Sequence, residues 1–260
     1  LNDILYVATT GGGVFQKALS SATGPWTIVA NNNGLSNLSL ASIIAVNNTL
    51  YVGTNGGGAF QKNVDDNNPW SAVANNTGMT SQYIYAMTLS NNTLYVGSTG
   101  GVFQKTLNNN NPWAAVANNM GLTSLTTYSL TLFNNVLYAG SAGRVFQKTL
   151  NDNSPWTLVN ITGLPSNRTI NALVGVNNVL YAGTFGGGVF QKNLLNANEG
   201  WTLVVNNNGL TNLSVRSMII FNNILYAGTN NGVFQKNVTD TNPWTLIANN
   251  TGLPQSQRNV

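Results

Sequence analysis

Two residue types are missing from this 260-residue chain, and charged residues are scarce. Without cysteine or histidine, the sequence excludes disulfide frameworks, the usual zinc clusters, cysteine nucleophiles and imidazole acid–base chemistry. Only 6% of the residues are charged, ten Lys plus Arg against six Asp plus Glu, which is about a quarter of the usual fraction. Most familiar kinds of enzyme site are therefore excluded from the start.

The few cations are scattered along the whole length, although they give a net charge of +4. A nucleic-acid-binding protein needs clustered Lys and Arg to neutralise phosphates, so we expect no nucleic-acid partner. No apolar run approaches the roughly 18 residues that a membrane-spanning helix requires, and no basic-then-apolar leader opens the chain. We therefore expect a protein that does not span a membrane.

What the chain does contain is one module repeated six times. The motif that begins Leu5-Tyr6-Val7 and continues through Gly13 to Val14-Phe15-Gln16-Lys17 returns at steps of 43 to 45 residues. Its tyrosines are Tyr6, Tyr51, Tyr95, Tyr138, Tyr181 and Tyr226. Every lysine and every tryptophan belongs to the same module, one of each per copy. Self-similarity at this period is typical of a repeat architecture.

Each copy predicts four short strands, because apolar and β-branched runs are separated by Asn, Gly and Pro. In the second full copy the strands are expected at 84–89, 94–97, 102–105 and 113–117. Asn91-Asn92 predicts a tight hairpin turn between the first two, since asparagine tolerates positive φ. The equivalent pairs are Asn47-Asn48, Asn134-Asn135, Asn177-Asn178 and Asn222-Asn223.

Repeats of this length with four strands predict an all-β fold, a six-bladed β-propeller with four antiparallel strands per blade. No segment shows the 3.6-residue period of a helical solenoid, and a parallel β-helix usually repeats over shorter coils. We expect one domain over residues 1–260, with the first blade shared between both termini. The sequence begins in a second strand at 4–9, and Val260 matches Ile170 at the start of a first strand. The C-terminal end should therefore supply the innermost strand of the first blade, about five residues short.

The motifs resemble two known propeller repeats. The segment 208–233, from Asn208-Gly209-Leu210 to Leu225-Tyr226-Ala227-Gly228, resembles the repeat of two-component-regulator-type sensor propellers. The segment 180–202 is similar to the Asp-box repeat of sialidase-type proteins. The likeness covers all six copies and implies the propeller fold. It does not imply one function, because such families include sensors, lectin-like binders, sorting receptors and glycosidases.

Departures from the Asp-box pattern argue against catalysis and against a metal site. Only three copies keep an aspartate in the turn, at Asp66, Asp152 and Asp240, where an Asx-type turn explains it. Sialidase chemistry needs an arginine trio, a Tyr–Glu pair and an acid, but the chain's one glutamate, Glu199, lies in a peripheral turn. Opposed carboxylates within roughly 10 Å are not apparent either. We expect no catalytic residue, no metal and no cofactor.

Three side-chain sets could instead bind a ligand. The six lysines end the third strands and predict either a cationic ring or, more simply, solvated strand ends that protect an edge. The tryptophans could stack on sugars or pack beneath the preceding turn: Trp26, Trp70, Trp113, Trp156, Trp201 and Trp244. Asparagine amides beside the glycine loops suit hydroxyl-rich ligands, although Asn also favours turns: Asn32, Asn76, Asn119, Asn207 and Asn250.

These features predict a non-catalytic binding propeller, extracellular or at the cell surface, with a carbohydrate or protein ligand. Weak lectin-like sites in several copies would act together through avidity. The alternative is a structural subunit of a surface layer, filament or other homo-assembly, because the low charge gives little repulsion between copies.

Overall fold

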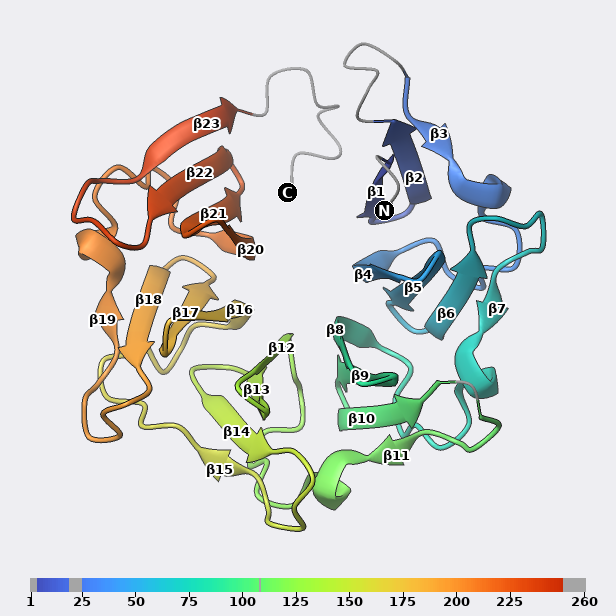
Figure 1. Cartoon of the computed structure of the whole chain (residues 1–260), viewed down its shortest axis with the longest axis horizontal. Helices are drawn as coiled ribbons and strands as arrows, with labels where there is room; N and C mark the ends of the chain where they lie inside the picture. The colour runs from blue at the N-terminus through green and yellow to red at the C-terminus, as the bar shows by residue number, and fades with distance from the viewer. Residues whose placement is uncertain (1–3, 19–24, 108, 250–260) are drawn as a thin grey trace. The chain divides into compact units, whose positions relative to one another are not determined.

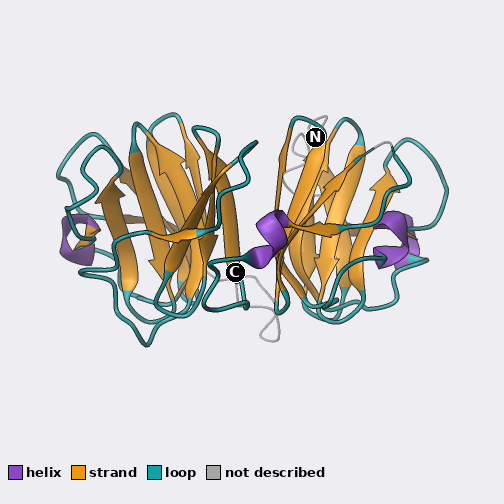
Figure 2. Cartoon of the chain, turned by 90° about the horizontal axis from the view of Figure 1, so that it is seen from below, coloured by secondary structure: helices purple, strands orange, loops and turns teal. Residues whose placement is uncertain are grey.

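The computed structural model describes residues 4–18, 25–107 and 109–249. The chain divides into two compact units, residues 1–118 and residues 119–260. Both are built from antiparallel strands in sequence order, with short 3-10 turns beside the strands (Figure 2). No helix in the described ranges has the length and apolar character needed to cross a membrane.

The first unit contains three sheets (Figure 1). The first is three-stranded in the described residues: β1 (Ile4–Thr9), β2 (Gly13–Ala18) and β3 (Thr27–Ile28). The second contains β4 (Leu40–Val46), β5 (Thr49–Thr54), β6 (Gly58–Asn63) and β7 (Ser71–Ala72). The third contains β8 (Ile84–Ser90), β9 (Thr93–Ser98), β10 (Gly101–Thr106) and β11 (Ala114–Ala115). The 3-10 turns η1 (Val29–Asn32), η2 (Val73–Asn76) and η3 (Val116–Asn119) follow the fourth strands.

The second unit contains three four-stranded sheets. The first is β12 (Ser129–Phe133), β13 (Val136–Gly140), β14 (Val145–Thr149) and β15 (Thr157–Leu158). The second is β16 (Ile170–Val176), β17 (Val179–Thr184), β18 (Gly188–Asn193) and β19 (Thr202–Leu203), followed by η4 (Val204–Asn207). The third is β20 (Val215–Phe221), β21 (Ile224–Thr229), β22 (Gly232–Asn237) and β23 (Thr245–Asn249).

This architecture confirms the fold class predicted from the sequence, an all-β six-bladed propeller. The predicted fourth strand is wrong in length: it was expected over 113–117, and only Ala114–Ala115 pairs with β10. The chain then turns through η3, in which Ala117 and Asn118 have φ of 48° and 50°. Positive φ ends the pleated ladder, because it turns the backbone away from the extended conformation.

The Asn-Asn hairpins are confirmed. Asn91 and Asn92 have φ of 44° and 62°, and the other four pairs also have positive φ at both positions. Two consecutive residues at positive φ make the type I′ turn, whose twist matches that of the strands it joins. Asparagine therefore takes the place that glycine often has in such hairpins.

The core of each unit lies between successive sheets. In the first unit, Tyr51 of β5 belongs to the same buried cluster as Ile84 of β8 and Phe103 of β10. In the second unit, Tyr181 of β17 packs with Val215 and Phe234 in the same way. The second strands β9 and β17 are buried on both faces, which explains their continuous apolar sequence. The predicted closure by the C-terminal strand lies outside the described residues, which end at residue 249.

Candidate functional site

Five of the six lysines at the ends of the third strands are buried, so their interpretation as solvated strand ends is wrong, and Lys17 is half-buried. Lys62, Lys148 and Lys236 each have side chains only 2–3% exposed. Each ammonium group donates to the carbonyl of the next residue, to the carbonyl four residues on, and to the Asp side chain there. Three oxygen acceptors match the three N–H bonds of an ammonium group.

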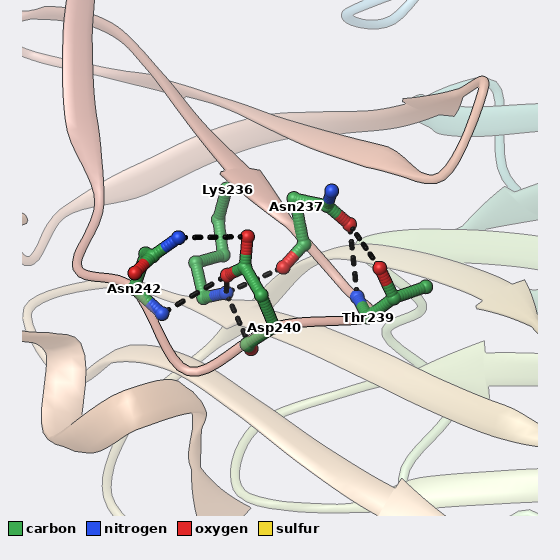
Figure 3. Close-up of polar contacts among 5 residues, drawn as sticks. All are labelled: Lys236, Asn237, Thr239, Asp240 and Asn242. Atoms are coloured by element: carbon green, nitrogen blue, oxygen red, sulfur yellow. Dashed lines mark hydrogen bonds and ion pairs between the residues drawn. The ribbon is translucent and has the colours of Figure 1, made fainter.

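Figure 3 shows this arrangement around Lys236, whose Nζ lies 2.8 Å from the Asp240 carbonyl oxygen and 2.6 Å from its Oδ1. The hydrogen bond from the lysine is the main cause that lowers the pKa of Asp240 below its ordinary value, and the same holds for Asp66 and Asp152. The Asp side chains also accept from the backbone N–H two residues on, as in Asn242 N–H to Asp240. These aspartates are therefore structural, as the Asx-turn interpretation predicts.

Three copies keep the lysine without the aspartate, and two of them are described at this turn. Lys105 donates to the Asn109 carbonyl at 2.8 Å and to its Oδ1 at 2.6 Å. Lys192 donates to the carbonyls of Asn196 and Glu199. The turn therefore requires the ammonium group more than the carboxylate. The four-residue spacing from Lys to Asp was the sequence signal that could have revealed this contact.

Five of the six candidate tryptophans are buried, with 2–3% exposure: Trp70, Trp113, Trp156, Trp201 and Trp244. The indole N–H of Trp113 donates to the Val73 carbonyl at 3.0 Å, and that of Trp201 to the Asn160 carbonyl at 2.9 Å. Such burial leaves no open ring face for a sugar, and it agrees with the packing interpretation. Trp26 differs, because 43% of its surface is exposed.

The same tryptophans join each sheet to the loop that precedes it. The backbone N–H of Trp113 donates to the Thr77 carbonyl at 2.8 Å, and Trp70, Trp156, Trp201 and Trp244 make the equivalent bond at 2.7–2.8 Å. Gly78 follows Thr77 with φ of 94°, and a Cβ there would lie 2.1 Å from the Trp113 carbonyl oxygen. This close approach of two backbones explains the invariant glycine of the loop.

The side chains of three candidate asparagines make hydrogen bonds within the fold. The Asn76 Oδ1 accepts from the Ala59 N–H at 2.8 Å, and its Nδ2 donates to the Gly57 carbonyl at 3.1 Å. Asn32 and Asn207 make the same two bonds to their own glycine loops. All three are at most 9% exposed. Asn119 is partly exposed, and Asn250 lies outside the described residues.

The neighbouring amides form a groove in the first unit, which sequence reasoning missed. A cavity of about 410 Å³ lies between β2 with η1 and the turn that joins β6 to β7. Its polar lining includes Gln16, Asn31, Asn33, Lys62, Asp66 and Asn67. The volume falls within the range of small-ligand pockets. Asn31 and Asn33 flank the buried Asn32, and both are exposed.

The amides of this groove are available to a ligand. The side chains of Gln16, Asn31, Asn33 and Asn67 make no hydrogen bond to another described residue. Each amide offers two donors and an acceptor, so the groove presents both kinds of group side by side. Val29, Val64 and Pro69 add apolar surface to the same cavity. This combination suits a ligand with hydroxyl groups on a partly apolar ring.

The described carboxylates lie in the turns between third and fourth strands: Asp65, Asp66, Asp152, Glu199 and Asp240. Three of them are held by lysine. Within the described ranges, no group of three acidic residues could hold a metal ion. The burial of Tyr51, Tyr95, Tyr138 and Tyr181 raises the pKa of each phenol, which keeps these side chains protonated in the core.

Comparison with known proteins gives a fold but no family. No protein-family model matches the chain, and no curated protein matches it. Among solved structures, the chain is similar to the extracellular domain of the one-component system BT4673 from B. thetaiotaomicron, with a TM-score of 0.72 and 18% identity over 96% of this chain and 32% of that one. It is also similar to an ancestral GH74 enzyme, with a TM-score of 0.64 and 18% identity over 95% of this chain and 37% of the enzyme. The computationally designed Ika8 protein matches with a TM-score of 0.59 and 13% identity over 94% of this chain and 70% of the designed protein.

This chain therefore spans about a third of the length of the BT4673 domain and of the GH74 enzyme. Identities of this size establish the propeller fold alone. The sensor-propeller likeness of the repeat agrees with the BT4673 structure, whereas the Asp-box likeness has no such counterpart among these three structures.

Proposed function

We propose that this chain is a non-catalytic binding module that recognises a neutral, hydroxyl-rich ligand, a carbohydrate, in the groove between β2–η1 and the β6–β7 turn. The observation that carries the proposal is that exposed side-chain amides without a hydrogen-bond partner among the described residues lie beside Asn32, whose amide is hydrogen-bonded. The Asn32 side chain hydrogen-bonds to the glycine loop, whereas the side chains of Asn31 and Asn33 on either side make no hydrogen bond to a described residue. Exposed amides of this kind pair well with sugar hydroxyls.

The repeat extends the proposal to other blades. Gln61, Asn75 and Asn110 occupy the equivalent positions between the second and third sheets of the first unit. Gln191 and Asn206 occupy them in the second unit. Weak binding at each position would gain through avidity when the ligand is a polymer. An extracellular location and a sensing role are supported by the similarity to the extracellular domain of the one-component system BT4673.

A glycan array probed with the multimerised chain tests the ligand class, and calorimetry with the best glycan then tests the groove. Replacing Asn33 and Asn67 with alanine should weaken binding about tenfold or more, since each neutral hydrogen bond contributes about 1 kcal/mol. Asn198→Ala, an exposed amide of the second unit, is the matched control and should bind as the unchanged chain does. An array without any bound glycan would remove the carbohydrate proposal.

A subunit of a surface layer or filament remains the second candidate. Ile219 and Phe221 of β20 are 63% and 64% exposed, and the low charge of the chain gives little repulsion between copies. Assembly predicts that light scattering will show oligomers that grow with concentration. Monodisperse monomers at every concentration would argue against it.

A further inference from the structure

The described arginines of the second unit lie at one end of its sheets, apart from the described carboxylates. Arg144 is in the loop between β13 and β14, Arg168 precedes β16, and Arg216 is the second residue of β20. In consecutive antiparallel strands, these positions share the end where second strands pass into third strands. The described carboxylates of this unit, Asp152, Glu199 and Asp240, lie at the opposite end. The arginine end of these sheets is therefore positively charged.

Two of these arginines meet at one exposed aromatic residue. The guanidinium carbon of Arg216 lies 4.9 Å from the centroid of the Phe185 ring. Nη1 of Arg168 lies 3.5 Å from the Phe185 carbonyl oxygen, and the same guanidinium covers Gly186. Phe185 is 42% exposed, although it follows a buried strand. Its pairing with Ser214 brings the two sheets together at this point.

A β-bulge positions Arg216. The register between β20 and β21 shifts between Val215 and Ser217, so Arg216 has no partner across the ladder. Its Nε donates to Asn230 Oδ1 at 3.1 Å, which fixes the plane of the guanidinium. Bulges commonly direct a side chain toward a site. The equivalent bulges in β4, β8 and β16 carry Ala41, Tyr85 and Asn171, so the fold requires the bulge but not the arginine.

The described arginines form no ion pair with a described carboxylate, unlike Lys62, Lys148 and Lys236. The ion pairs found in the described part of the chain all join a lysine to an aspartate. Arg168 contacts the carbonyl oxygen of Phe185 and Arg216 contacts its ring, so two guanidinium groups lie against the same exposed residue. The forked N–H groups of arginine match planar and tetrahedral oxyanions.

We infer that Arg168, Phe185 and Arg216 form a second binding site, for a saccharide that carries an oxyanion, either a uronate carboxylate or a sulfate ester. The guanidinium groups bind the oxyanion, and the exposed part of the Phe185 ring contacts the apolar face of the sugar. A nucleic acid fits less well, because it would need many phosphate contacts and this end supplies three described arginines. The inference rests on the proposed function only for the ligand class, since its residues are separate from the groove.

Calorimetry with trigalacturonate tests the site. Arg168→Gln and Arg216→Gln should each weaken binding about tenfold or more, because each removes a charge-assisted hydrogen bond. Arg144→Gln removes the same charge from an exposed loop residue of the same unit and should change affinity by less than about twofold, as expected of a distant charge. An equal loss in all three variants would overturn the site and indicate general attraction. Absence of binding by both trigalacturonate and a sulfated trisaccharide at millimolar concentration would overturn it as well.

Chemical variants of the probe distinguish the source of the negative charge. The methyl ester of trigalacturonate should bind at least about tenfold more weakly, since it keeps the ring and loses the carboxylate; equal binding would overturn the inference. Tighter binding of the sulfated trisaccharide would support the site and assign it to sulfate. Arg216→Lys keeps the charge and should fold, but it should still weaken binding, because lysine lacks the planar fork. Unchanged affinity in this variant would contradict the proposed geometry.

The two proposals fail separately. The double change of Asn33 and Asn67 to alanine should leave trigalacturonate binding at the arginine site unchanged, and Arg168→Gln should leave neutral-glycan binding in the groove unchanged. If the unchanged chain binds trigalacturonate but no neutral glycan, the groove proposal is removed and the arginine site is not affected.

Discussion

The ammonium nitrogen of Lys236 lies 2.6 Å from Oδ1 of Asp240, four residues later in the chain. The lysine side chain is 2% exposed, whereas the aspartate is 33% exposed. A buried cation thus organises a surface turn, because it donates hydrogen bonds to the turn's carbonyl groups and carboxylate. The lysines of four other repeats donate to the carbonyl group four residues later in the same way, so this contact is a structural part of the repeat.

Replacing Lys236 with methionine should destabilise the fold by about 2 kcal/mol, because the carbonyl groups of Asn237 and Asp240 lose a charged donor. Denaturant unfolding at pH 7 measures the change. Thr239→Ala, in the same turn, is the control for general disturbance and should have a smaller effect. Equal stability of the Lys236 variant and the unchanged chain would contradict the role of the ammonium group.

Stability should fall in acid, because the pKa values of Asp66, Asp152 and Asp240 are lowered by hydrogen bonds from lysine. A carboxylate with a lowered folded-state pKa stabilises the fold above its ordinary pKa of 3.8 and loses that effect as pH falls through the folded value. Changing all three residues to asparagine should flatten the stability curve below about pH 4. Unfolding midpoints measured between pH 2 and pH 7, at about one-unit steps, test this. The same acid slope in the variant would contradict it.

Asn109→Asp should stabilise the third blade slightly, since it places a carboxylate beside the ammonium group of Lys105, as in three other repeats. The gain should be at most about 0.5 kcal/mol, because the new pair is exposed on one side. Thermal unfolding at low and high salt measures it, and salt should reduce the gain. Asn110→Asp adds the same charge one residue away and should give no gain.

Gly78→Ala should destabilise the first unit by more than about 2 kcal/mol, because the backbone has positive φ and the new Cβ would meet the Trp113 carbonyl. Gly11→Ala is a matched control with φ of 96° and open space around the Cβ. It should cost only about 1 kcal/mol, from the backbone conformation alone. Chemical denaturation measures both. Equal costs would show that the close approach to Trp113 contributes nothing.

Asn76→Ala should cost about 2–3 kcal/mol, because it leaves the Ala59 N–H and the Gly57 carbonyl without their partners. Asn75→Ala is the matched control, since Asn75 has nearly the same φ and an exposed side chain. It should cost no more than about 1 kcal/mol. Equilibrium unfolding of the two variants compares them directly. A larger loss in Asn75→Ala would contradict the separation of structural from ligand-binding amides.

Much of the fold could be predicted from the period of the repeat. The strand positions around Leu94 and Val102 and the hairpin at Asn91-Asn92 follow from local alternation and from the tolerance of asparagine for positive φ. The brief fourth strand could not be predicted, because the 3-10 turn after it uses the same apolar residues as an extended strand would. Its first residue, Val116, is buried in either case.

The candidate site was less accessible to sequence reasoning. Adjacent asparagines look alike in sequence, yet Asn32 is bonded to its glycine loop and Asn31 faces the groove. Which of two neighbouring side chains is buried depends on the turn of the backbone between them, and the composition gives no sign of it.

The sequence alone determined the all-β repeat, its six copies and the absence of cysteine and histidine chemistry, because these depend on residue type and on local periodicity. The tertiary structure decided that lysines are buried, that most tryptophans join sheets, and that Arg168 and Arg216 meet at Phe185. Those features depend on contacts between residues far apart in the chain or on opposite sides of a turn, and only the packing of successive sheets brings them together.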